Sequence, residues 1–213
     1  MDAASDRASS ERVLPNDYDS DPDRFATNQL VTRRFLAGHD VHPDVAGRFA
    51  DEQLRQVVDI GGGNGVLARL LVQRDINVVV ADRARHVALA PRPVVQADAC
   101  HLPFNDSTFD GAAALYMLYH LAEPLVALRE AHRILRVGGL LAVCAPSRYN
   151  DPELAGQIPQ WGRPLSFDAE NAAALLRQVF DEVEIQRWDA PLIHLPDREA
   201  LQLYLRGTLC SQY

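Results

Sequence analysis

The chain has 213 residues, 47% of them hydrophobic and 23% charged, which is typical of one globular domain with a sizeable core. Its formal net charge is −8 and its basic residues are scattered, so no basic face for a nucleic acid is expected. All 21 basic residues are arginines, which excludes Schiff-base chemistry and a phosphate-binding loop that needs its lysine.

The sequence shows no sign of export or of membrane insertion. It contains no apolar run of about 18 residues, and its first 17 residues are polar, without the apolar region of a signal peptide. Cys100, Cys144 and Cys210 are far apart and form no metal-binding pair. We therefore expect a cytoplasmic protein without a metal site, and we predict that residues 1–17 form a disordered tail.

Residues 18–50 are predicted to be helical. An apolar stripe predicts an amphipathic helix over residues 21–37, and a second, short helix is predicted over residues 43–49. Tyr18 and Phe25 are candidates to cover a ligand as part of a helical lid. A helix that simply packs on the edge of the sheet is the alternative.

Strands and helices alternate through the rest of the chain. The predicted strands span residues 57–60, 77–81, 94–97, 111–116 and 140–145, with a sixth at 182–188. The predicted helices start near residues 65, 83 and 123 and also cover residues 168–180 and 197–206. The first five strands are continuous apolar runs, as expected for a parallel sheet with helices on both faces.

Residues 57–71 are predicted to form a buried strand, a glycine turn and a helix. Gly61, Gly63 and Gly65 allow positive φ angles and a close approach of the backbone to a ligand. The following helix directs its free N–H groups and its positive dipole end at that ligand. Asp59, at the end of the strand, suits a ligand with a cationic group and would repel a pyrophosphate.

Three further features fall at the ends of later strands, where open α/β sheets bind ligands. Asp82 closes the second strand, about 20 residues after Asp59, a spacing at which an acid can hydrogen-bond a ribose. Asp98 follows the third strand, and residues 114–116 end the fourth. Each acid has a plainer alternative, since Asp59 could cap the next turn and the others could be ordinary loop acids.

Four segments in register resemble the class I S-adenosylmethionine-dependent methyltransferases, in particular the bacterial group with small-molecule substrates. They are VVDIGGGNGVLARLL, VVVADRA, VVQADACHLPFNDSTFD and LREAHRILRVGGLLAVCAPS. The resemblance implies an α/β, Rossmann-like fold with a mostly parallel sheet and an N-terminal helical lid. It also implies one domain over residues 18–213, in which residues 55–147 form the cofactor-binding core and residues 148–213 the substrate-side and C-terminal elements. The family's final antiparallel strand has no counterpart before Tyr213, and we expect a C-terminal tail to be missing.

The resemblance further implies S-adenosyl-L-methionine as methyl donor and S-adenosyl-L-homocysteine as product. Asp59 and the region of Gly61 would hold the amino-acid end of the donor, Asp59 often through water. Gly63 and Gly65 would allow the close approach of the backbone.

The remaining donor-binding residues follow the later strands. Asp82 would accept hydrogen bonds from the ribose hydroxyls, and Arg83 is assigned to the same site. Asp98 would bind the adenine amino group, and the backbone N–H of Ala99 would face a ring nitrogen. The backbone of Leu115, or of the residue before it, would reach the methionine amino group.

Methyl transfer is an in-line displacement in which the enzyme mainly aligns the reactants and excludes water. A phenol or alcohol acceptor needs a base, whereas a free amine hardly does. His120 is the candidate base and Tyr119 a second candidate; packing under the cofactor or in the wall of the site is the alternative for both. His39, His42 and His101 have no sequence context that singles them out.

The acceptor is expected to be a small organic molecule. The chain lacks the motifs of DNA-methylating enzymes, Cys144 is predicted to be core, and no acid cluster indicates a metal-dependent catechol enzyme. Residues 146–164, with Trp161 and several prolines, are expected to shape the acceptor site, with a plain surface loop as the alternative. The arginine-only composition is typical of a GC-rich bacterial genome, for which natural-product biosynthesis is a reasonable setting.

Two other functions stay open. A non-catalytic protein that binds the methyl donor would carry the same donor-binding acids. A nicotinamide-dependent oxidoreductase would need G-x-G-x-x-G, but position 66 is valine. No nucleic-acid or membrane partner is expected, and both a monomer and a homodimer are compatible with the sequence.

Overall fold

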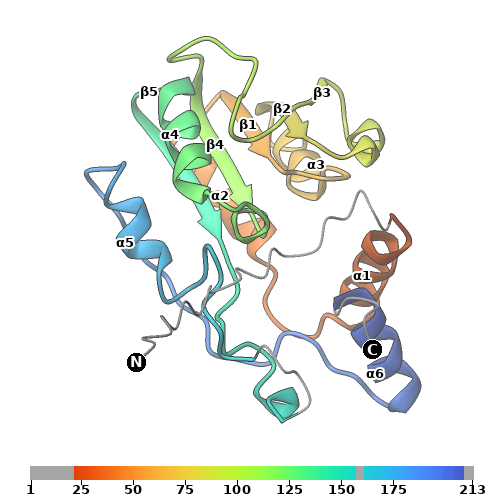
Figure 1. Ribbon diagram of the computed structural model, residues 1–213. Helices are drawn as coiled ribbons and strands as arrows, with labels where there is room; N and C mark the ends of the chain where they lie inside the picture. Colours follow the sequence, from red (N-terminus) through yellow and green to blue (C-terminus); the bar gives the residue numbers. More distant parts are fainter. Residues whose placement is uncertain (1–21, 157–160, 209–213) are drawn as a thin grey trace, which may run out of the picture.

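One parallel sheet with the strand order β3-β2-β1-β4-β5 organises the computed structural model, which describes residues 22–156 and 161–208 (Figure 1). The strands are β1 (Gln56–Ile60), β2 (Asn77–Asp82), β3 (Val94–Gln96), β4 (Phe109–Leu115) and β5 (Leu135–Cys144). The first five predicted strands and the predicted α/β, Rossmann-like class are thereby confirmed. The predicted tail over residues 1–17, Tyr18 and Cys210 lie outside the described residues.

Helices cover both faces of the sheet because successive strand residues point to opposite sides. Val57 of β1 belongs to one buried cluster and Val58 to the other. The first face is covered by α2 (Val41–Asp51), α3 (Val66–Val72) and the 3₁₀ helix η1 (Arg85–Leu89). The second face is covered by α4 (Pro124–Ile134) and α5 (Ala172–Leu176). Burial on both faces explains why the central strands β1, β2 and β4 are mostly apolar.

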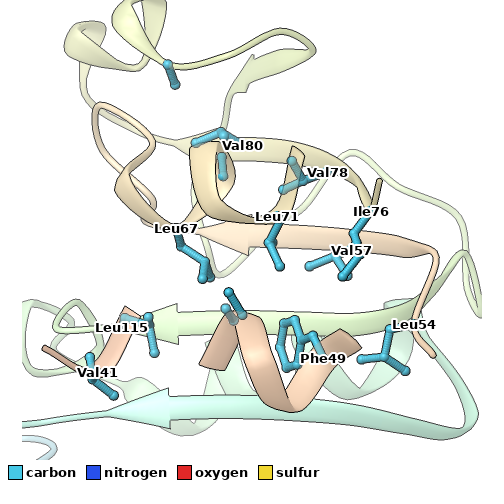
Figure 2. Packing of buried hydrophobic residues seen from close by; sticks show 14 of the residues in the cluster. Val41, Phe49, Leu54, Val57, Leu67, Leu71, Ile76, Val78, Val80 and Leu115 are labelled. Atoms are coloured by element: carbon cyan, nitrogen blue, oxygen red, sulfur yellow. The ribbon is translucent and has the colours of Figure 1, made fainter. Parts of the chain in front are cut away.

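The core of the first face fixes the position of α2 against the sheet. Figure 2 shows Phe49 of α2 near Val57 of β1 and Leu71 of α3, and all three side chains are fully buried. A buried aromatic ring of this size contributes roughly 3 kcal/mol of hydrophobic stabilisation. At the start of the same helix, Val41 lies beside Leu115, the last residue of β4 (Figure 2). The start of α2 is therefore held at the carboxyl edge of the sheet.

The helices α1 (Pro22–Phe35) and α6 (Arg198–Thr208) pack against each other, away from the sheet faces (Figure 1). Gly207 allows this contact, because a Cβ there would lie 2.9 Å from the Cα of Asn28. The chain after α1 is also tied to the segment before α6, since the N–H groups of Ala37 and Gly38 both donate to the carbonyl of Leu192. The role of these helices as a lid stays a prediction, and the side chain of Phe25 is outside the described set.

The sixth strand predicted at residues 182–188 is wrong. The segment pairs with no strand of the described chain, and its apolar residues Ile185 and Trp188 remain 44% and 46% exposed. Trp188 instead lies against His39, with 5.4 Å between the ring centroids. An alternating pattern forms a strand only where a neighbouring strand and a covering layer receive it.

Two helices are shorter than predicted. The helix expected near residue 83 is the short 3₁₀ element η1, because Pro91 and Pro93 follow it closely and disfavour a longer helix. Of the helix expected over residues 168–180, only Ala172–Leu176 (α5) is helical. No helix in the described ranges is long and apolar enough to cross a membrane.

Candidate functional site

The predicted donor-binding residues are distributed along the carboxyl ends of four neighbouring strands. In the parallel register Asp59 stands opposite Val80 of β2 and Ala113 of β4, and Asp82 stands opposite Gln96 of β3. The chain leaves β1 to build β2 and β3 on one side and returns to build β4 on the other. This reversal is the point at which open α/β sheets bind ligands.

The turn after β1 has the backbone that its glycines were predicted to allow. Gly61, Gly63 and Gly65 take φ angles of +66°, +55° and +81°. At Gly61 a Cβ would also lie 2.7 Å from the Cγ of Met117, so this turn and the chain after β4 approach each other closely. Only glycine fits this turn without strain or displacement of its neighbour.

Asp59 is buried beneath this turn with half of its carboxylate unpaired. Its side chain is 2% exposed, and Oδ2 has no hydrogen-bond partner among the described residues. Burial, and then the charge of Asp82, raise the pKa of Asp59 to about 7. The backbone of Ala68, in the first turn of α3, has a smaller effect that lowers this pKa. Asp59 therefore presents an orphaned acceptor beneath the turn. An acceptor of this kind fits a ligand ammonium group.

Gly62 makes room for that carboxylate. A Cβ at position 62 would lie 2.4 Å from the Cγ of Asp59 and 2.4 Å from its Oδ2. Both distances are far below van der Waals contact, so the third glycine of the turn is required by the buried acid.

Asp82 joins the glycine turn to the loop after β2. Its Oδ2 accepts from the N–H of Gly63 and its Oδ1 from the N–H of Ala84, both at 2.8 Å. Both oxygens of Asp82 therefore act as hydrogen-bond acceptors, which is the chemistry that ligand hydroxyls require. The neighbouring Arg83 is exposed, and its carbonyl accepts from Nε2 of Gln96 at 2.8 Å.

Asp98 and Ala99 form a tight turn after β3. The Oδ1 of Asp98 accepts from the N–H of Cys100 at 2.9 Å, and its carbonyl accepts from the N–H of His101. Asp98 is exposed and Ala99 is buried. A backbone hydrogen bond connects the start of this turn to β2, since the N–H of residue 97 donates to the carbonyl of Asp82.

The chain leaves β4 through a residue in an unusual conformation. Leu115 is buried, but the next residue, Tyr116, has a φ angle of +56° and is 37% exposed. A bulky side chain in this region of φ/ψ space is rare and marks strain that the surroundings must support. The support comes from β5, since the N–H of Tyr116 donates to the carbonyl of Cys144 at 2.9 Å. Burial, and then the neighbouring Cys144, raise the pKa of the Tyr116 hydroxyl.

Tyr119 and His120, the predicted candidates for catalysis, follow in the 3₁₀ helix η2 (Leu118–His120). Their rings lie 4.3 Å apart between centroids. The carbonyl of Tyr119 accepts from the Oγ of Ser166, and the N–H of His120 donates to the carbonyl of Met117. Both residues thus lie near the end of β4, and their part in catalysis stays a prediction.

Asp40 and His42 also reach this edge, although no sequence context singled out His42. Asp40 is the N-cap of α2, and its Oδ1 accepts from the N–H of His42 at 3.0 Å and from its Nδ1 at 2.6 Å. The His42 ring lies 6.4 Å from the ring of Tyr116. An aspartate just before a helix is a recognisable cap, but the predicted start at residue 43 missed it.

The segment after β5 is held by a buried ion pair. Nη2 of Arg148 lies 2.9 Å from Oδ1 of Asp168, which is fully buried. Trp161 packs edge-on against Tyr149 and donates from Nε1 to the carbonyl of Asn150 at 2.9 Å. The expected contribution of residues 146–164 to the acceptor site stays a prediction, and residues 157–160 lie outside the described set.

No cluster of three or more histidine, cysteine or acidic side chains in the described ranges has the arrangement of a metal site. Cys144 is buried in the core, as predicted, and forms no disulfide.

Residues 58–143 match a protein-family model described as "Methyltransferase domain". The matched range begins in β1 and ends in β5, so it contains the glycine turn and the ends of all five strands.

Two curated relatives show how far the similarity extends. The chain is 36% identical over 93 residues to a demethylmenaquinone methyltransferase of Corynebacterium kroppenstedtii, covering 42% of this chain and 41% of the relative. It is 24% identical over 206 residues to the O-methyltransferase cnsE of Penicillium expansum, covering 87% of this chain and 72% of the relative. The chain thus spans less than half the length of the first relative.

Solved structures share the fold at low identity. A SAM-dependent methyltransferase from Thermotoga maritima superposes with a TM-score of 0.57 at 24% identity, covering 76% of this chain and 78% of that chain. At this identity the likeness extends to the fold.

Proposed function

We propose that this chain is a class I S-adenosylmethionine-dependent methyltransferase that transfers a methyl group to a small organic acceptor, because residues 58–143 match the methyltransferase family model. The observation that carries the proposal is Asp59, a buried carboxylate with one unpaired oxygen beside a glycine turn. When bound, S-adenosylmethionine supplies an electrophilic methyl group on a cationic sulfur. The side chains and backbone of this chain bind it, orient the acceptor and exclude water.

The first half of the proposed donor site is the β1 turn. Asp59 and Gly61 hold the amino-acid end of the donor, and Gly63 and Gly65 allow the backbone to approach it. The unpaired Oδ2 of Asp59 supports this role, because an ammonium group would supply the missing hydrogen-bond donor.

The second half follows β2, β3 and β4. Asp82, with Arg83 beside it, binds the ribose hydroxyls; Asp98 and the backbone of Ala99 bind the adenine; and the backbone of Leu115 reaches the methionine amino group. The order of these residues along one sheet edge supports the assignment.

The proposed acceptor carries a hydroxyl group on a ring. One curated relative is named for a quinone and another for O-methylation, and a hydroxyl-bearing acceptor, such as the reduced form of a quinone, fits both names.

We place the reaction in natural-product or quinone biosynthesis, in the cytoplasm, and expect the enzyme to be a monomer or a homodimer. Sedimentation at several protein concentrations decides between the two oligomeric states.

Calorimetric titration with S-adenosylhomocysteine tests the donor site. Asp82→Ala should weaken binding at least tenfold, because the site loses an acceptor for the ribose hydroxyls. Asp181→Ala, which changes an exposed acid, serves as the matched control and should bind like the wild type. Equal affinity of the wild type and Asp82→Ala would remove Asp82 from the ribose site.

Release of S-adenosylhomocysteine in the presence of phenols and hydroquinones separates an enzyme from a non-catalytic binding protein. A parallel titration with NADH separates both from an oxidoreductase. Binding of neither the donor nor its product would refute the proposed function.

A further inference from the structure

Asp40 and His42 form a hydrogen-bonded dyad with a defined tautomer. The distance from Oδ1 of Asp40 to Nδ1 of His42 is 2.6 Å. A carboxylate can only accept, so Nδ1 carries the proton and Nε2 keeps its lone pair while the ring is neutral. Among the described residues no hydrogen bond engages Nε2. His42 is therefore oriented as a proton acceptor.

Long-range packing places this dyad at the ligand edge of the sheet. Val41, between the two residues of the dyad, packs beside Leu115 at the end of β4 (Figure 2). The His42 ring then lies 6.4 Å from Tyr116, the strained residue that follows. One residue further on, Met117 contacts the glycine turn so closely that a Cβ on Gly61 would be 2.7 Å from its Cγ. The dyad and the β1 turn thus meet the same short stretch of chain after β4.

We propose that His42 is the general base of the reaction and that Asp40 is its positioning residue, a role that rests on the proposed function. Nε2 of His42 takes the proton of the acceptor hydroxyl. The electron pair left on the acceptor attacks the donor methyl group, the carbon–sulfur bond breaks, and neutral S-adenosylhomocysteine leaves. Asp40 stabilises the imidazolium that forms, and the proton then passes to water.

The charged and titratable neighbours of the dyad fit this role. His39, just before α2, and Asp44 of α2 form a second ion pair beside it, and Tyr116 faces it from the chain after β4. Cys144 and Tyr119 also interact electrostatically with Tyr116. Burial alone would raise the pKa of Asp40, but its hydrogen bonds to the side chain and backbone of His42 and the charges of His42 and His39 lower it. Asp40 therefore stays ionised beside the imidazole.

The pair of His39 and Asp44 provides a matched control. Nε2 of His39 hydrogen-bonds Oδ2 of Asp44, both side chains are nearly half exposed, and the ring lies against Trp188 rather than Tyr116. His39→Asn removes a comparable ion pair from the same helix end and leaves both hydrogen bonds between Asp40 and His42 in place.

The test compares His42→Asn, Asp40→Asn, His39→Asn and the wild type with phenols of graded acidity, S-adenosylmethionine being the methyl donor. At neutral pH, His42→Asn should lower kcat for unsubstituted phenol by about 100-fold and Asp40→Asn by about tenfold. Both losses should shrink for the acidic 4-nitrophenol, and at high pH, where the acceptor ionises by itself. His39→Asn, which weakens only a long-range charge effect on Asp40, should lose far less activity than either variant of the dyad.

A second readout does not depend on turnover. In the presence of S-adenosylhomocysteine, bound 4-nitrophenol should show its phenolate absorption with the wild type below the pH at which it ionises in water, and His42→Asn should abolish this shift. A uniform loss of kcat at all pH values, or an unchanged profile in His42→Asn, overturns the proposal, as does His120→Asn alone removing the pH dependence. The role of His42 alone is overturned if the wild-type protein binds S-adenosylhomocysteine but neither ionises nor methylates any phenol. Failure to bind S-adenosylhomocysteine refutes the proposed function.

Discussion

Asp59 makes the stability of the ligand-free protein depend on pH. The folded chain holds the pKa of this carboxyl at about 7, well above its ordinary value of 3.8. Between these two values the folded state binds more protons than the unfolded state, so the free energy of unfolding falls as pH rises. The contribution is present in full below about pH 4 and is lost as pH passes about 7.

Asp59→Asn should remove this dependence. A shift of this size corresponds to on the order of 4 kcal/mol between the ends of the window. Urea unfolding at a series of pH values should show the wild type losing stability relative to Asp59→Asn from pH 4 to pH 8. A constant difference between the two proteins would show that the carboxyl titrates normally.

Gly62→Ala should disturb Asp59 directly. The new Cβ would meet the buried carboxyl at 2.4 Å, so the acid or the turn must move. We expect a loss of about 1–3 kcal/mol in the free energy of unfolding, as for other overpacked sites, and weaker binding of S-adenosylhomocysteine. Gly156→Ala is the control, because a Cβ there has no neighbour within 4 Å. Equal effects of both substitutions would show that the turn yields easily.

Among the elements, α2 carries the proposed base, and its sequence contains a glycine that lowers the stability of the helix. Gly47 lies inside α2, and a Cβ there would meet nothing within 4 Å. Gly47→Ala should therefore raise the free energy of unfolding by about 0.5–1 kcal/mol, since alanine loses less backbone entropy in a helix. Chemical denaturation measures the change, and any loss of stability would contradict the open space found beside position 47.

The pairing of α1 with α6 depends on Gly207. A Cβ at this position would lie 2.9 Å from both the backbone N and the Cα of Asn28. Because backbone cannot give way as a side chain does, Gly207→Ala should push the helices apart and speed proteolytic cleavage within α1. Cleavage at the wild-type rate would mean that the two helices separate without cost to the rest of the chain.

The elements show which features a sequence can predict. The strands β1 to β5 were predictable because burial on both faces leaves continuous apolar runs. The segment 182–188 also carries apolar residues, Val183, Ile185 and Trp188, but no neighbouring strand in the described ranges receives it. The positions of the acids proposed for the donor site were predictable for a similar local reason, since each lies within or just after the carboxyl end of a strand. The approach of His42 to Tyr116 was not, because it depends on Val41 packing against Leu115, more than 70 residues away in the sequence.

In the molecule as a whole, the proposed site lies where the two halves of the sheet meet. The β1 turn supplies a buried acid, and α2 brings the proposed base across the end of β4 from the first face. The glycine turn and residue 117 after β4 lie within side-chain contact of each other. Donor and acceptor binding are therefore expected to depend on one another through this contact.

Binding of the donor should be coupled to proton release from the folded protein. Below about pH 7 the ligand-free protein holds a proton on Asp59, whereas an ammonium group facing Oδ2 requires the ionised carboxylate. Calorimetric titrations of S-adenosylhomocysteine at pH 6, in two buffers of different ionisation enthalpy, should report release of up to about one proton per ligand, and affinity should rise with pH until about pH 7. Asp59→Asn should bind more weakly and release none. Proton release that persists in Asp59→Asn would assign the linkage to another group and would remove the ammonium contact from Asp59.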